Sequence, residues 1–426
     1  MYAPMSSKQN CLLKNKSNIT GDLWDEFIYS QDIPLLHNEP ARMDTMHEAR
    51  ALEIHSASSQ STLIKTRVPF IDIAKGIGII LVVMGHNDFS LISPYAHKLI
   101  YSFHMPMFFF MSGIFFKPDM PFLKFLWNRF QRVLKPFLAI LLLIFFASLS
   151  FSKISFLMAG RRLIKAMYGS GYYIDWVQLW FLPHLFAVSL FAYFFFKVAK
   201  RMRPEWLRWI LLMVLFVAGV LSMKLFWPFE LSFRGKALTL FGLPYGLDMV
   251  TVSGFFFILG YELNQRHREA WFTNGLAFLV SGALLISMVW YFPARIDLNT
   301  RQFDSLIINT VEALTGILFM LALSRQLARI SWLSSVFSYV GQASLIVLLF
   351  QVPIQDFWGQ KLFAITGDRS VAYWLSFLVG VVGPLVINAL FIRPNPIVRE
   401  WFGQAAPPEE KQASIMQLAR PSTPEH

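Results

Sequence analysis

Long apolar segments alternate with short polar linkers from residue 69 to residue 392. A helix needs about 20 apolar residues to cross the hydrocarbon core of a bilayer. Ten segments approach this length, at approximately 69–89, 97–116, 134–152, 177–199, 207–227, 238–261, 271–292, 305–324, 336–357 and 371–392. The pattern therefore predicts an all-α, polytopic integral membrane protein with about ten transmembrane helices.

The sixth segment is the least regular. Pro244 and Gly246 interrupt it, and Asp248 lies within it. A helix broken at membrane depth is tolerated where its freed backbone groups face protein or water, so we expect a break here. Asp248 has two open interpretations: it binds the hydroxyls of a substrate, or it pairs with a basic neighbour.

The ends of the chain are polar. Residues 1–66 have no early apolar core of the kind a signal peptide needs, and they lack the apolar density to pack a domain. Residues 394–426 are polar and Pro-rich. We therefore predict three parts: a disordered cytoplasmic N-terminal extension at 1–66, a transmembrane domain at 67–393, and a disordered cytoplasmic tail at 394–426.

Composition agrees with a membrane protein, since 55% of the residues are hydrophobic and only 15% are charged. The net charge of +12 comes mainly from basic linkers, such as 117–135 and 197–208, which argues against nucleic-acid binding and indicates the cytoplasmic side. Both termini are expected on that side, although the basic residues at 153–165 argue against it. The single cysteine excludes an intrachain disulfide, and no spacing indicates a metal site.

Three ionisable residues interrupt the first apolar segment: Asp72, Lys75 and His86. Such groups cost several kcal/mol inside a membrane, so they suggest function. Asp72 and Lys75 are three residues apart on one helix face, where their charges neutralise each other.

Lys75 and His86 are eleven residues apart, which returns to the same helix face and separates them by about 16 Å. That separation suits an extended pantetheine arm, with a cation on the phosphates of coenzyme A and an imidazole at the thioester. The spacing alone leaves a second interpretation open, in which Lys75 extends to the interface and His86 makes ordinary hydrogen bonds.

The pattern Asp72-x-x-Lys75 with ten residues before His86 resembles the first motif of the membrane-bound acyltransferase-3 family. The segment Tyr101–Phe116, which contains Phe-His-Met-Pro and Met-Ser-Gly, resembles the second motif, in the form of the fucose 4-O-acetylase-like branch. The resemblance covers about residues 67–393. It departs from the pattern at Lys75, where an arginine is usual, and at Gln351, where relatives commonly carry histidine.

The resemblance implies transfer of an acetyl group from acetyl-CoA to a sugar hydroxyl of a polysaccharide or lipid-linked glycan, with no bound cofactor. His86 is the candidate general base, because an imidazole with a pKa near ~6.5 can take the hydroxyl proton. An acyl-histidine intermediate stays open. Asp72 is expected to hold Lys75 charged.

Further residues are candidates at the same site. Lys75, Arg129 and Arg132 are candidates for the phosphates of coenzyme A, although both arginines also fit a solvated cytoplasmic role. Pro106 is expected to bend the helix beside His104, which either lines the active site or packs with a hydrogen bond. His184 carries the same choice, with packing favoured.

Competing functions are a transporter or flippase for a small molecule or lipid-linked sugar, an O-succinyltransferase of the same family, and a non-catalytic subunit for polysaccharide export. The expected partners are membrane lipids, acyl-CoA and a glycan or lipid-linked sugar acceptor, without nucleic acid. The expected location is the inner membrane of a bacterium. The sequence does not indicate an oligomeric state.

Overall fold

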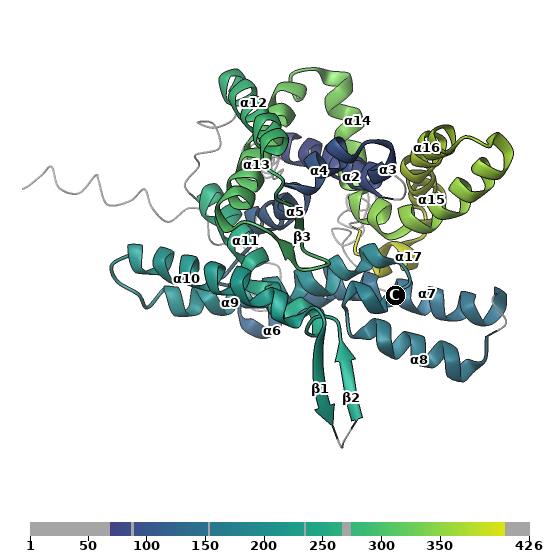
Figure 1. The fold of residues 1–426 in the computed structure, drawn as a ribbon, viewed down its shortest axis with the longest axis horizontal. Coiled ribbons are helices and arrows are strands. Elements are labelled where there is room, and N and C mark those ends of the chain that lie inside the picture. The colour runs from purple at the N-terminus through teal and green to yellow at the C-terminus, as the bar shows by residue number, and fades with distance from the viewer. Residues whose placement is uncertain (1–68, 87–88, 152–153, 234–235, 266–273, 405–426) are drawn as a thin grey trace, which may run out of the picture. The chain divides into compact units, whose positions relative to one another are not determined.

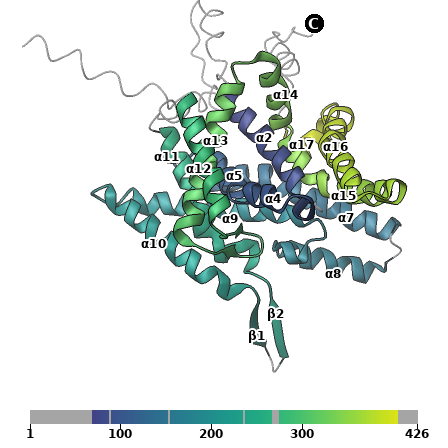
Figure 2. The same cartoon turned by 45° about the horizontal axis from the view of Figure 1, so that its top comes forward.

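The computed structural model describes residues 69–404 except 87–88, 152–153, 234–235 and 266–273. The predicted N-terminal extension, 1–66, lies outside these residues. About 80% of the described residues are helical, so the all-α prediction is confirmed. The described residues belong to one unit, whose elements Figures 1 and 2 label.

The first half of this unit is a series of helices, several of them short. Its helices are α2 (Pro69–Gly85), α3 (Phe89–Ile92), α4 (Pro94–Tyr101), α5 (His104–Ile114), α6 (Phe122–Arg129), α7 (Lys135–Phe151), α8 (Phe156–Met167), α9 (Phe181–Ala199) and α10 (Trp206–Ser222). A π-helical turn, η1 (Phe130–Leu134), joins α6 to α7, and short 3-10 turns stand at η2 (Gly171–Tyr173), η3 (Val177–Trp180) and η4 (Met223–Phe226).

The second half starts with a 3-10 turn, η5 (Pro244–Met249). The helices that follow are α11 (Val250–Gln265), α12 (Gly275–Tyr291), α13 (Leu306–Leu327), α14 (Ser331–Gln342), α15 (Ser344–Thr366), α16 (Arg369–Ile387) and α17 (Pro396–Trp401). A second π-helical turn, η7 (Asn388–Ile392), extends α16.

Six helical segments of the described chain are long and apolar enough to cross a membrane. They are Phe122–Phe151, Val177–Ala199, Trp206–Phe226, Pro244–Gln265, Leu306–Leu327 and Arg369–Ile392. α14 and α15, bent by 74°, make a seventh if they are taken as one broken span. The predicted count of about ten is therefore not confirmed.

The shortfall comes largely from the predicted spans at 69–89 and 97–116, which are divided in the structure. α2 ends at Gly85, and its 17 residues extend only about 25 Å. The second span separates into α4 and α5 at Ser102 and Phe103, and Pro106 is the third residue of α5. A proline is tolerated in the first turn of a helix, so the break precedes Pro106 instead of being centred on it.

α2 packs against α13, α14, α15 and α16, and Figure 2 shows it among these helices. Gly76 of α2 and Gly341 of α14 make the close approach possible. A Cβ added to Gly76 would overlap the carbonyl oxygen of Phe337, and one added to Gly341 would overlap that of Asp72. Small residues let helix backbones meet in this way in membranes. The pairing holds the Lys75 end of α2 in place.

Two antiparallel hairpins interrupt the helices. β1 (Phe229–Phe233) pairs with β2 (Lys236–Leu240), so the residues from 238 that we predicted to open the sixth helix form a strand instead. The expected break follows at η5, where Tyr245 and Gly246 have φ of 56° and 65°. β3 (Ile296–Asp297) pairs with β4 (Gln302–Phe303) between α12 and α13.

The predicted disordered tail, 394–426, begins with an ordered helix. Asn395 caps α17 by accepting hydrogen bonds from the backbone N–H groups of Ile397 and Val398. Lys135 Nζ donates to Glu400 Oε1 over 2.8 Å, and this bond holds the pKa of Glu400 below its usual range. The tail prediction is therefore wrong for α17, because a cap and an ion pair hold it. Residues 405–426 lie outside the described part of the chain.

Candidate active site

A cavity of about 290 Å³ lies between α2, α5, η1, α9 and α15. α2 contributes Lys75, Ile79 and Val82 to its wall, and His86, the first residue after α2, continues it. These residues are spaced by four, three and four positions, so they form one stripe along the helix. The stripe places Lys75 and His86 on the same cavity, about 16 Å apart along the helix axis.

α5 runs along the same cavity in the opposite direction. His104 stands at its first residue, and Met105, Phe108, Met111 and Ser112 continue the wall towards its last turn. Gly85, next to His86, lies against the Tyr101 ring, and the Tyr101 and His104 rings are 4.7 Å apart between centroids. His86 and His104 therefore share one end, which we call the histidine end.

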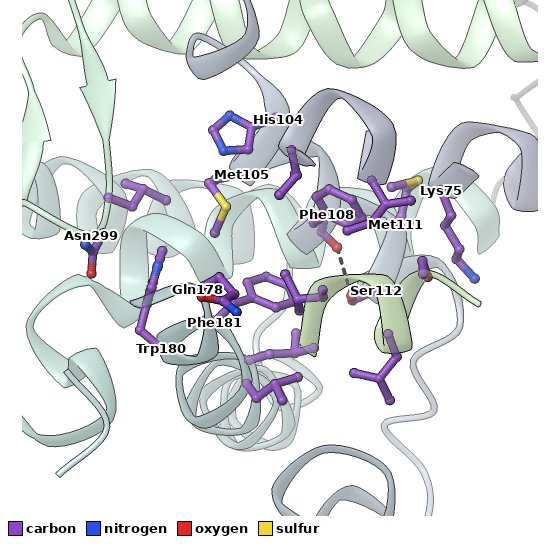
Figure 3. A pocket seen from close by; sticks show the side chains of 18 of the residues that line it. Lys75, His104, Met105, Phe108, Met111, Ser112, Gln178, Trp180, Phe181 and Asn299 are labelled. Carbon is purple, nitrogen blue, oxygen red and sulfur yellow. Dashed lines mark hydrogen bonds between the residues drawn. The ribbon is translucent and has the colours of Figure 1, made fainter. Parts of the chain in front are cut away.

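Lys75 stands at the other end of the cavity, the cationic end (Figure 3). Its Nζ lies 3.9 Å from Asp72 Oδ1 and 4.6 Å from the centroid of the Phe115 ring. Asp72 itself is not in the cavity wall. Both contacts are long, and the Lys75 side chain is 28% exposed, so the ammonium can meet an anion in the cavity.

The two arginines predicted at this end have different surroundings. Arg132 lines the cavity from the π-helical turn η1. Arg129 does not, because its guanidinium lies 5.6 Å from the ring centroids of Phe116 and Phe125. Phe116 follows Phe115, the ring under Lys75, so Arg129 lies near the cationic end but behind its wall. Lys75 and Arg132 are thus the two cations that line the cavity.

The helix end before His86 is held by two side chains that the sequence did not suggest. Gln355 of α15 donates its Nε2–H to the carbonyl oxygen of Val83 over 3.1 Å. Tyr373 of α16 donates its hydroxyl to the carbonyl oxygen of Met84 over 2.5 Å. Carbonyls in the last turn of a helix have no partner within the helix. These bonds satisfy them and fix the direction in which α2 presents His86.

His104 is oriented by a hydrogen bond of its own. Its Nδ1 lies 3.0 Å from the carbonyl oxygen of Ile100 in α4. A carbonyl only accepts, so Nδ1 carries the proton and Nε2 keeps its lone pair. The helix break at Ser102 and Phe103 places this carbonyl beside the ring. The site therefore has a second imidazole whose Nε2 can accept a proton.

Four residues of the β3–β4 hairpin also line the cavity, of which Asp297 and Asn299 are polar. Gln178 and Trp180, of η3, line it as well and were not among the predicted site residues. Figure 3 shows Asn299 and Trp180 far from Lys75, with apolar side chains between them. Trp180 opens a segment, Trp180–Phe186, that resembles the family, but no motif marks Asp297, Asn299 or Gln178, which reach the cavity only through tertiary folding.

Asp248 is paired rather than open to the cavity. Its carboxylate accepts two hydrogen bonds from Arg301, Nε to Oδ2 over 2.7 Å and Nη2 to Oδ1 over 3.1 Å. Both side chains are almost fully buried. Of the two interpretations left open by the sequence, the structure shows the ion pair.

His184 and Gln351 also lie outside the cavity wall. His184 Nδ1 donates to the carbonyl oxygen of Tyr245, and its Nε2 lies 2.8 Å from Ser253 Oγ, which makes it a hydrogen-bonded packing residue. Gln351 is fully buried in α15. Among the described residues, no cluster of histidine, cysteine, aspartate or glutamate has the geometry of a metal site.

The cavity wall therefore contains two cations, Lys75 and Arg132, and two imidazoles, with Lys75 and the imidazoles at opposite ends and apolar side chains between them. A long ligand with an anionic head can lie along it and present its far end to a base. This geometry suits group transfer from a carrier to a hydroxyl.

Comparison with protein families supports this chemistry. The model of the acyltransferase-3 family, described as an acyltransferase domain, matches residues 68–393. No curated protein and no solved structure matches the chain significantly.

Proposed function

The chain belongs to the acyltransferase-3 family and is a multi-pass membrane acyltransferase, and on this premise we propose that it acetylates a glycan. The donor is acetyl-CoA, and the acceptor is a sugar hydroxyl of a polysaccharide or a lipid-linked glycan. The resemblance of Tyr101–Phe116 to the fucose 4-O-acetylase-like branch supports both choices. The inner membrane of a bacterium is the proposed location.

The donor enters by its phosphates at the cationic end. Lys75 binds a phosphate as a point charge, and Arg132 offers a planar set of donors to another. The pantetheine arm then lies along the apolar middle, between Ile79 and Val82 of α2 and Phe108 of α5. Its thioester reaches the histidine end, since about 16 Å of helix separates Lys75 from His86.

At the histidine end, His86 acts as general base. The acceptor hydroxyl oxygen forms a bond to the thioester carbonyl carbon while His86 takes the hydroxyl proton. The tetrahedral intermediate then collapses, the C–S bond breaks, and the proton passes to the coenzyme A thiolate. His104 lies beside this step, with Nε2 able to share the proton, and Asp72 supports Lys75 from outside the wall.

One observation carries the proposal: Lys75 on α2 and His86, the residue that follows α2, line opposite ends of the same cavity. A transporter needs no fixed separation between a cation and an imidazole. The apolar wall between them also matches the pantetheine arm better than it matches a polar cargo.

The test uses the purified full-length protein, acetyl-CoA labelled in the acetyl group, and de-O-acetylated glycan from cells that produce the protein. We expect label to appear in the glycan as an alkali-labile ester. Transfer from succinyl-CoA in place of acetyl-CoA would move the donor to the dicarboxylic class. Binding of glycan without transfer from either donor would overturn the proposal in favour of transport.

A further inference from the structure

The wall of the cavity at its histidine end contains polar residues that have no role in binding the acyl donor. They are Asp297, Asn299 and Trp180. We propose that these residues are the acceptor subsite, and that Asp297 selects acceptor sugars without a negative charge near the reacting hydroxyl. This inference rests on the proposed function, and it adds which residues bind the acceptor sugar and which charge that sugar carries.

The two carboxylate oxygens of Asp297 have different surroundings. Oδ1 accepts the backbone N–H groups of Asn299 and Thr300 over 3.0 and 3.4 Å, which closes a turn. Oδ2 accepts no hydrogen bond from the described residues. One oxygen therefore fixes the turn, and the other is left for a donor group in the cavity.

The turn is held from below by the buried ion pair. Arg301 binds Asp248 through Nε and Nη2, and it donates Nη1–H to the carbonyl oxygen of Asn299 over 2.7 Å. Its guanidinium also lies 4.7 Å from the ring centroid of Trp227. Arg301 has a φ of 58°, a backbone conformation that residues other than glycine seldom adopt. Asp248 is thus a positioning residue for the turn that carries Asp297 and Asn299.

Asn299 and Gln178 have acceptor atoms without donors. Asn299 Oδ1 and Gln178 Oε1 are both buried, and neither accepts a hydrogen bond within the described part of the chain. Buried carbonyl oxygens are normally paired, and both residues line the cavity, so a ligand that brings hydrogen-bond donors can satisfy them. Asn299 also lies directly against Gly171, where a Cβ would overlap Oδ1.

A sugar matches this wall in two ways. Its edge carries hydroxyl groups, which donate to the Asp297 carboxylate and to the two amide oxygens. Its faces carry C–H groups, which pack on an aromatic ring such as that of Trp180. The same carboxylate repels an acidic group, so a uronic acid, a sialic acid or a phosphorylated sugar is disfavoured. It also keeps the phosphates of the donor at the far, cationic end.

The decisive variant is Asp297→Asn. The amide oxygen of asparagine can still accept the N–H groups of Asn299 and Thr300, so the turn is kept while the charge is lost. We expect KM for the acceptor to rise about 10- to 100-fold, as for the loss of a charged hydrogen bond, with KM for acetyl-CoA unchanged.

Two further variants support this measurement. Asp304→Asn removes a carboxylate that follows β4 and does not line the cavity, and the amide oxygen can still accept the backbone N–H of Arg295, so every constant should stay unchanged. Gly171→Ala should raise the acceptor KM without touching Asp297, because its Cβ meets only the end of the Asn299 side chain. Each variant is first compared with the wild type for membrane abundance and thermal stability.

The acceptors are de-O-acetylated oligosaccharides from the producing cells, separated into neutral and acidic fractions. The wild type should acetylate the neutral fraction, and Asp297→Asn should narrow the difference between the fractions. Preference of the wild type for the acidic fraction, or an unchanged acceptor KM in both Asp297→Asn and Gly171→Ala, would overturn the subsite. Absence of transfer by the wild type to either fraction would remove the proposed function itself, and the subsite with it.

Discussion

Replacement of Lys75 by alanine tests the cationic end of the cavity, because its ammonium has only loose partners. Lys75 Nζ lies 3.9 Å from Asp72 Oδ1 and 4.6 Å from the centroid of the Phe115 ring, so neither group neutralises the ammonium fully. A hydrogen bond between charged groups contributes about 1.5–3 kcal/mol. Lys75→Ala should therefore raise KM for acetyl-CoA about 10- to 100-fold, and Lys75→Arg should keep most of the affinity.

Asp72→Asn should produce a weaker form of this defect. The Asp72 side chain is 20% exposed, and the ion pair is at the limit of contact, so its loss costs about 0.2–1 kcal/mol. That corresponds to a change of about fivefold or less in KM. The exposed lysine Lys117, in the linker after α5, is the matched control, because it carries the same charge but does not line the cavity.

The assay compares acetyl-CoA with acetyl-pantetheine, which has the same thioester and arm but no phosphates. If Lys75 acts on the phosphates, Lys75→Ala raises KM for acetyl-CoA and leaves KM for acetyl-pantetheine near the wild-type value. An equal loss with both donors, at equal membrane abundance, would show that Lys75 supports the fold or the thioester end, and would refute the assignment.

Three further predictions follow from the packing around α2 and from its two ends. Tyr373→Phe leaves the carbonyl oxygen of Met84 without its partner, so kcat should fall while KM for acetyl-CoA is kept, as measured by steady-state transfer. Gly76→Ala forces α2 away from α14 and should lower the thermal unfolding temperature by several degrees, whereas Gly160→Ala, with open space around its Cβ, should not lower it. Reporter fusions at residue 400 and in the 293–304 loop should lie on opposite sides of the membrane. Glu400 binds Lys135 on the side of the cationic end, and the loop lines the histidine end. If both fusions report the same side, this orientation is wrong.

The sequence predicted the stripe of the first helix well, because its evidence is local. Lys75 and His86 are separated by a whole number of helical turns, and any α-helix through these residues brings both to one face. The break near Pro244 was equally visible, since proline and glycine act on the backbone where they stand. The sequence shows Gly76, but it does not show that α14 packs so closely there that a side chain would not fit.

The number of spans and the polar residues at the histidine end were not predictable in the same way. The segment 97–116 reads as one apolar run, and only the structure shows that it divides at Ser102 and Phe103. Asp297 ends the two-residue strand β3, and its place at the cavity depends on the ion pair between Asp248 and Arg301, which are 53 residues apart. Such contacts are set by tertiary structure, and periodicity carries no signal for them.

The central claim is that an imidazole at the histidine end removes the proton of the acceptor hydroxyl, and kcat of His86→Ala tests it most directly. At wild-type membrane abundance, transfer from acetyl-CoA should fall by ~10²–10⁴-fold while KM for acetyl-CoA is kept. His104→Ala, measured in parallel, should cause a smaller loss. Near-normal turnover of His86→Ala, together with loss of turnover in His104→Ala, would contradict the assignment of His86 and move the base to His104.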